Sequence, residues 1–246
     1  MSLRCRVFLA GEGPSDIGDL ARAAPYRKAN EGFLQPVLRR LAGPDLDLEF
    51  EGAAVKTLAK ARVTTPGGLL RRHAAQAYVL AETEGCAALV FVVDLDKQSG
   101  KRASHAEAMA RGRDLQASID SGFSDGRQGG DPARSPLATV IGIPCRMIEA
   151  WALGDPQALR AASGREVDAS ACANPEALWG KIDDPDSRHP KRVIARLMGG
   201  GVGFAKIAET ADPVRIERAC PTSFRPFAKA VRAQASACAA QAARRR

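Results

Sequence analysis

The sequence has few aromatic residues and no long apolar run. Aromatic residues make up only 5% of its 246 residues, which argues against a single-strand nucleic-acid groove built on base stacking. The longest uninterrupted apolar run, residues 86–93, is far shorter than the about 20 residues that a membrane-spanning helix needs. The N-terminus leads directly into a strand-like segment and leaves no room for a signal peptide. These features predict a cytoplasmic protein that has no membrane partner.

Several motifs of catalytic and redox proteins are also missing. The six cysteines form no C-x-x-C pair and no metal-finger spacing, so we expect reduced, structural thiols. No phosphate-binding G-x-x-x-x-G-K-[ST] loop is present, because the glycine-rich segment 199–203 is followed by Phe204. The only two tyrosines, Tyr26 and Tyr78, have no neighbours that would support covalent, topoisomerase-like chemistry. The sequence therefore argues against a P-loop ATPase and against DNA strand passage.

The chain carries a basic charge. Lysine and arginine number 36 against 28 acidic residues, which gives a formal net charge of +8. An excess of this size favours a polyanionic partner, either nucleic acid or a nucleotide. The alternative is that the charge only aids solubility, and the charge alone does not decide between the two.

Strand-like and helix-like segments alternate through the first two-thirds of the chain. Four short apolar or alternating segments predict strands, and amphipathic stretches between them predict helices. The strands are expected at residues 4–10, 46–55, 86–93 and 137–143, and the helices at 33–41, 68–84 and 104–118. Such alternation predicts an α/β fold with a mostly parallel central sheet and helices on both faces.

The remaining segments are expected to be a loop and a helical extension. Residues 120–135 are rich in glycine, serine, aspartate and arginine, which is typical of a long surface loop. After residue 145 the pattern changes to helices and turns, beginning with one helix over residues 147–160. We therefore expect an α/β core over residues 1–145 and a helical extension over 146–246, packed together as one unit.

Acidic residues follow three of the predicted strands. Glu12 and Asp16 come after the first strand, Asp94 and Asp96 after the third, and Glu149 shortly after the fourth. Ligands of parallel sheets bind at the carboxyl ends of the strands, so these side chains are expected to meet. Carboxylates at i and i+2 in extended chain project to the same side. Oxygen donors without histidine or thiolate suit Mg²⁺ or Mn²⁺ rather than Zn²⁺.

Each acidic group also has an ordinary structural explanation. Glu12 and Asp16 would then only shape a turn and cap a helix. Asp94 and Asp96 would be common strand-ending aspartates, and Glu149 would be a carboxylate favoured by a helix dipole. Their joint occurrence at successive strand ends is what favours a shared site.

These motifs resemble those of the Toprim superfamily, which includes topoisomerase–primase catalytic domains and OLD-family nucleases. Segment 12–16, E-G-P-S-D, resembles the OLD-type signature E-G-x-[ST]-[DE], and Asp94-x-Asp96 follows it at a suitable distance. The whole chain resembles a bacterial Toprim-like family known as domain of unknown function 4276. The further segments that carry this resemblance are I-E-A-W at 148–151, the nearby Asp155, and C-P-x-S-F at 220–224.

The resemblance implies a Toprim-like fold and a role for the acidic residues. Glu12 is expected to act as a general acid or base or as a metal ligand, with Asp94 and Asp96 as the metal-binding pair. Asp16 is expected to support a metal, as in OLD nucleases. Glu149 is a candidate ligand of a second metal site, and Asp155 is a weaker one.

Two lysines just past the aspartate pair are candidates for a role in charge stabilisation. Lys97, or alternatively Lys101, is placed to stabilise charge on a phosphate oxygen. The ordinary alternative is that both are solvated surface lysines. The catalytic residues expected from the sequence are therefore Glu12 and Lys97.

The predicted function is metal-dependent phosphodiester hydrolysis by a Toprim-like nuclease, with DNA favoured over RNA as substrate. OLD proteins carry an ATPase in the same polypeptide and this chain does not, so the resemblance suggests a separate ATPase subunit and a role in anti-phage defence. The alternative is a non-catalytic Toprim-like subunit that binds and regulates a partner ATPase. A nucleotide phosphohydrolase ranks last.

Overall fold

The centre of the computed structural model is a parallel β-sheet. The structure describes residues 3–22, 26–58, 68–95, 105–130, 135–199 and 203–243, and within them four strands pair side by side, all parallel. The strands are β1 (Leu3–Gly11), β2 (Leu46–Ala54), β3 (Ala88–Val92) and β4 (Ala138–Gly142), in the spatial order β2-β1-β3-β4. The predicted α/β fold with a parallel sheet is confirmed.

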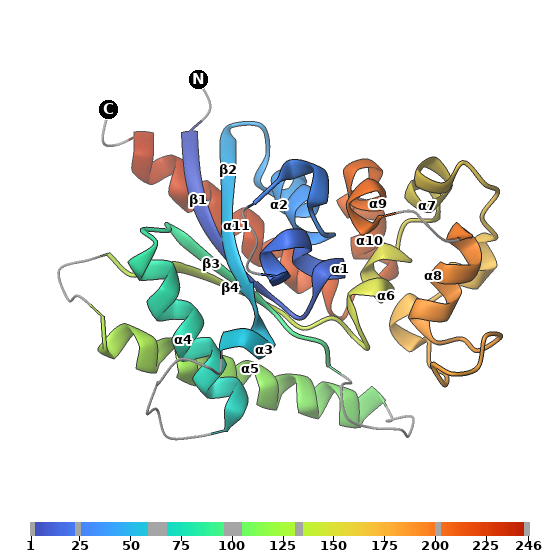
Figure 1. Ribbon diagram of the computed structural model, residues 1–246, viewed down its shortest axis with the longest axis horizontal. Coiled ribbons are helices and arrows are strands. Elements are labelled where there is room, and N and C mark those ends of the chain that lie inside the picture. The colour runs from blue at the N-terminus through green and yellow to red at the C-terminus, as the bar shows by residue number, and fades with distance from the viewer. Residues whose placement is uncertain are drawn as a thin grey trace.

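Helices surround this sheet (Figure 1). In chain order the α-helices are α1 (Pro14–Ile17), α2 (Leu34–Ala42), α3 (Val55–Leu58), α4 (Leu69–Thr83), α5 (His105–Gln128), α6 (Ile148–Ala152), α7 (Pro156–Ser163), α8 (Pro190–Met198), α9 (Phe204–Thr210), α10 (Pro213–Ala219) and α11 (Phe224–Ala243). Short 3₁₀ turns lie at η1 (Gly18–Arg22), η2 (Lys28–Asn30), η3 (Ala169–Cys172) and η4 (Pro175–Ala177). None of the helices in the described ranges is long and apolar enough to cross a membrane.

The inner strand β3 is apolar and buried on both faces because helices cover both sides of the sheet. Successive side chains of a strand point to opposite faces. In β1, Val7 and Leu9 join one buried apolar cluster, whereas Phe8 and Ala10 join another. The first cluster packs against α2 and α11, and the second packs against α4 and α5. The buried centre of the sheet leaves the strand ends as the natural place for polar groups.

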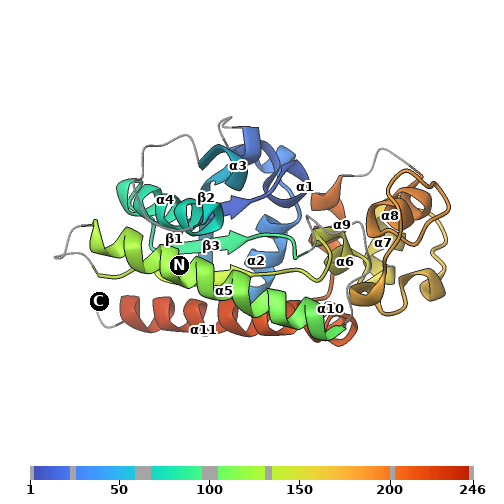
Figure 2. The same cartoon turned by 90° about the horizontal axis from the view of Figure 1, so that it is seen from below.

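The helical extension shares its core with the sheet. The first apolar cluster includes Val90 of β3 together with Phe227 of α11 and Trp151 of α6. Figure 2 shows α11 running along the length of the molecule, while α6 to α10 gather at one end. The boundary at residue 145 stays a prediction, since this cluster contains residues from both sides of it.

The prediction of a loop over residues 120–135 is wrong for the first part of this range, because α5 continues to Gln128. Ile119 and Phe123 are buried in the second apolar cluster. A side chain at Gly122 would overlap the carbonyl oxygen of Arg71, so this glycine permits the close approach of α4. Packing against α4 therefore overrides the low helix propensity of the glycines and serines.

The single helix predicted over residues 147–160 is also wrong. Helix α6 ends at Ala152, and α7 begins at Pro156. The carboxylate of Asp155 caps α7 by accepting hydrogen bonds from the backbone N–H groups of Gln157 and Ala158, at 3.0 and 3.3 Å. A capping aspartate followed by proline starts a new helix rather than continuing the old one.

Candidate functional site

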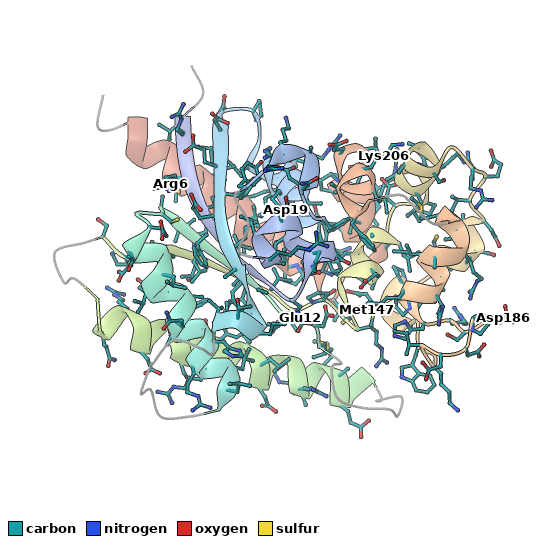
Figure 3. All side chains as sticks on the ribbon, in the orientation of Figure 1. Arg6, Glu12, Asp19, Met147, Asp186 and Lys206 are labelled. Atoms are coloured by element: carbon teal, nitrogen blue, oxygen red, sulfur yellow. The ribbon has the colours of Figure 1, made fainter. Side chains whose placement is uncertain are left out.

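Glu12 and Asp94 meet at the point where the order of the strands reverses. The chain passes from β1 to β2 on one side, and then crosses to β3 on the other side of β1. Ligands of open α/β sheets bind at this position, outside the carboxyl ends of the strands. The N–H group of Asp94 donates to Oε1 of Glu12 at 3.3 Å, which joins the segments that follow β1 and β3. Figure 3 labels Glu12 at this edge of the sheet.

Asp16 is turned back towards the end of β1 by the short helix α1. Its Oδ2 atom accepts hydrogen bonds from the backbone N–H groups of Glu12, at 2.6 Å, and Gly13, at 3.2 Å. The side chain is buried, with the residue only 5% exposed. Two backbone donors hold this carboxylate in one orientation beside Glu12.

Helix α6 brings Glu149 to the same edge. Arg146 has a left-handed backbone conformation, with φ of 73°, at the turn between β4 and α6. The N–H group of Ile148 then donates to Oδ1 of Asp94 at 3.2 Å, and Glu149 lies in the first turn of α6 with 3% exposure. A non-glycine residue in this conformation is strained by about 1–2 kcal/mol, and such strain collects at functional sites.

Glu12, Asp16, Asp94 and Glu149, the carboxylate cluster, influence one another electrostatically. Burial and, to a smaller extent, the charges of Glu12, Asp16 and Glu149 together raise the pKa of Asp94 to about 9. The pKa of Asp16 is raised to about 7. Burial and the charge of Glu149 raise this pKa, whereas the hydrogen bond from the Glu12 N–H lowers it. Like charges placed together away from water disfavour ionisation in this way.

Lys191 is a cation beside Glu149 that sequence reasoning missed. Its Nζ atom lies 3.8 Å from Oε1 of Glu149, and its side chain is 49% exposed. Burial raises the pKa of Glu149, and the charge of Lys191 opposes that rise. Lys191 lies in the first turn of α8, where Nδ1 of His189 accepts its backbone N–H at 3.3 Å. Nothing in the sequence links a lysine at the start of a late helix to Glu149.

The I-E-A-W and C-P-x-S-F segments meet in a structural clamp behind the site. Nε1 of Trp151 donates to Oγ of Ser223 at 2.7 Å, and this hydroxyl donates to Oε1 of Glu176 at 2.6 Å. The indole ring packs against Phe224 and Phe227, with ring centroids 5.1 and 4.9 Å away. The clamp fixes α6, so Trp151 and the C-P-x-S-F segment position Glu149, which the I-E-A-W segment itself supplies.

Asp155 does not join the carboxylate cluster. It is fully buried, and besides capping α7 it accepts the backbone N–H of Asp212 at 2.8 Å and lies 3.5 Å from Nη1 of Arg215. These contacts show that Asp155 links α7 to α10. Asp96, Lys97 and Lys101 lie outside the described residues.

The arrangement is not a complete metal-ligand set by itself. In the part of the chain that the structure describes, no group of three His, Cys, Asp or Glu side chains is arranged to hold a metal ion. The metal-binding roles of Glu12, Asp16, Asp94, Asp96 and Glu149 therefore stay predictions. A groove of about 600 Å³ between α5, β4 and α11 lies nearby, with Leu95, Ile143 and Cys145 among its lining residues.

The fold and the site define an α/β protein with a parallel sheet and with buried acidic groups at the point where the order of the strands reverses. The chain belongs to the family described as Domain of unknown function (DUF4276), whose sequence model matches residues 28–232. The match includes Asp94 and Glu149 and begins after Glu12 and Asp16. No curated protein and no solved structure is significantly similar to the chain. The predicted family is confirmed, and its relationship to Toprim and OLD nucleases stays a prediction.

Proposed function

We propose that this protein is a Toprim-like nuclease that hydrolyses phosphodiester bonds in nucleic acid with the help of Mg²⁺ or Mn²⁺. The observation that carries the proposal is the carboxylate cluster, gathered from the ends of three strands. Burying like charges side by side costs free energy unless a cation or protons neutralise them. A cluster that makes the metal-free protein less stable than neutral side chains would is expected of a ligand site and not of a structural one.

The donor set fits a divalent cation of the magnesium type. Mg²⁺ prefers oxygen ligands and is usually held by one or two carboxylates, with waters and substrate phosphates completing the octahedron. A set of fewer than three protein ligands is therefore compatible with Mg²⁺. Asp94 and Asp96 would hold the ion, and Glu149 would be a ligand of a second ion. When bound, such an ion polarises the phosphate and lowers the pKa of a bound water.

The chain's own residues supply orientation, proton transfer and charge. Backbone N–H groups hold one oxygen of Asp16 and one of Asp94 and so fix both carboxylates. In this proposal Glu12 accepts a proton from an attacking water, and Lys191 stabilises charge on a phosphate oxygen. The net charge of +8 favours the approach of a polyanion, for which we propose DNA in preference to RNA. A separate ATPase subunit and a role in anti-phage defence complete the proposal.

The proposed function is tested by incubating the purified protein with plasmid DNA, or with an RNA of similar length, in Mg²⁺ or Mn²⁺. We expect cleavage of DNA that EDTA abolishes, and a loss of about 100-fold or more in the Glu12→Gln and Glu149→Gln variants. Asp186→Asn is the control, because Asp186 is exposed at the far end of the helical extension (Figure 3). We expect this control to cleave like the wild type.

Two results would contradict the nuclease. One is cleavage that survives EDTA or both site variants, since the activity would then belong to another site or to a contaminant. The other is no cleavage even when the cognate ATPase is supplied, which would support the non-catalytic subunit instead. If the Glu12→Gln variant still co-purifies with that ATPase, its loss of cleavage reflects lost chemistry and not lost assembly.

Replacing Lys191 with methionine is expected to lower the cleavage rate by about 10- to 100-fold and to move its acid limb to higher pH. Removal of the cation raises the pKa of Glu149 further, so a higher pH is needed to ionise it. A pH–rate profile measures both effects. The exposed Lys181→Met is the matched control, and Lys191→Arg is expected to restore the profile in part. An unshifted acid limb in Lys191→Met would show that this lysine does not act on Glu149.

A further inference from the structure

Two cysteines from opposite ends of the chain come together on the face of the sheet that α11 covers. Cys5 lies in β1 and is buried, whereas Cys238 lies near the end of α11 and is partly exposed. Both line one small cavity of about 40 Å³ between the sheet and α11. Figures 1 and 2 both show that α11 ends near the start of β1.

The two thiols interact directly. Hydrogen bonding between the two neighbouring sulfurs raises the pKa of Cys5 and lowers that of Cys238 to about 7. By contrast, burial raises the pKa of Cys86 and Cys172 to about 11, and also raises that of Cys220. A thiolate is the reactive form of cysteine. The accessible member of this pair is therefore the one suited to attack an oxidant, with a second thiol beside it to resolve the product.

We propose that Cys5 and Cys238 form an intramolecular disulfide when the protein meets a peroxide, so that the last helix becomes covalently tied to the first strand. The thiolate of Cys238 attacks one peroxide oxygen, the O–O bond breaks, and the departing oxygen takes up a proton to leave as water. Cys238 is then a sulfenic acid. The sulfur of Cys5 attacks this sulfenic sulfur, the S–S bond forms, and hydroxide leaves as water with the proton of Cys5. Two thiols are oxidised by two electrons, and hydrogen peroxide is reduced to two waters.

This inference is independent of the proposed nuclease, and it gives α11 a further role. The same helix carries Phe227, which packs on Trp151 of α6. A bond between Cys5 and Cys238 closes almost the whole chain into one loop, which restricts the unfolded state. We therefore expect oxidation to raise the melting temperature by about 5 °C or more.

The full-length protein is treated with hydrogen peroxide, its remaining thiols are alkylated, and its peptides are mapped by mass spectrometry. We expect a cross-linked peptide that contains Cys5 and Cys238, two fewer alkylated thiols, and a monomer on a non-reducing gel. The rise in melting temperature should disappear with dithiothreitol. Cys238→Ser should abolish the cross-link and the rise, whereas Cys172→Ser, which removes another buried thiol, should retain both.

Three outcomes would overturn the inference. In one, Cys238 is linked to Cys86 or to another chain. In the second, Cys238 ends as a sulfinic acid while Cys5 remains a thiol. In the third, all six cysteines are alkylated to the same extent before and after peroxide treatment. Because the mapping is done on the wild-type protein, none of these results depends on whether a cysteine variant folds.

Discussion

Replacing Asp94 with asparagine is expected to abolish metal-dependent cleavage and, at about pH 8, to stabilise the protein. The pKa of Asp94 is raised to about 9 in the folded state, whereas an aspartate in an unfolded chain has a pKa of about 3.9. Between these two values the folded state holds a proton that the unfolded state has released. The free energy of unfolding therefore falls as the pH rises through this window.

Asparagine removes that pH dependence because it carries no charge at any pH. It also retains an oxygen that can accept the N–H of Ile148, so the contact with α6 is preserved. We expect the free energy of unfolding at about pH 8 to rise by on the order of 3 kcal/mol, and to change little near pH 4. Thermal or urea unfolding at the two pH values measures the difference.

Added Mg²⁺ provides the matched test of this effect. An ion that binds only the folded protein raises its melting temperature by mass action. We expect Mg²⁺ to stabilise the wild type at about pH 8 and to have little effect on Asp94→Asn. The exposed Asp186→Asn should behave like the wild type throughout. A destabilised Asp94→Asn at about pH 8 would mean that the carboxylate stabilises the fold, and it would remove the main physical reason for a cation.

The sheet and the edge that holds the site were predictable from local patterns. The apolar strand of residues 86–93 and the acidic residues that follow the strands depend only on alternation and on the geometry of parallel sheets. The hydrogen bond between Asp94 and Glu12 shows the expected approach of these two segments. Lys191 was not predictable, because its position depends on how α8 packs against α6, and this packing leaves no periodic trace in the sequence.

The contacts that hold α1 and Asp16 in place could not be predicted from the sequence either. The N–H group of Phe33 donates to the carbonyl of Ser15 at 2.8 Å, and Nε2 of Gln35 donates to the carbonyl of Ile17 at 2.9 Å. The fully buried Gln35 also accepts the N–H of Gly32 at 3.0 Å. These contacts hold the short helix α1 against the segment that begins α2. They are made by backbone groups and by one amide side chain, which no composition or spacing rule singles out.

Replacing Gly32 with alanine is therefore expected to damage both the fold and the site. A Cβ atom at this position would overlap the backbone of Asp16 and Ile17, which cannot move aside as a flexible side chain can. We expect the free energy of unfolding to fall by about 3 kcal/mol or more, as for other overpacked buried positions. The Asp16 carboxylate would lose its fixed place beside Glu12, so metal-dependent cleavage should fall with stability.

Gly13→Ala is the matched control. Gly13 belongs to the E-G-P-S-D segment and Gly32 does not, so the sequence motif alone would suggest that Gly13 is the more important glycine. The backbone of Gly13 is extended, with φ of −164°, and a Cβ atom there would have nothing within 4 Å. We expect its cost in stability to stay below about 1 kcal/mol, the usual cost of alanine at a helix N-cap. Urea denaturation followed by circular dichroism compares the two variants. Equal losses of unfolding free energy in the two variants would show that the contact between the Gly32 loop and α1 does not support the site. A loss confined to Gly32→Ala would show that the fixed position of Asp16 depends on close backbone packing.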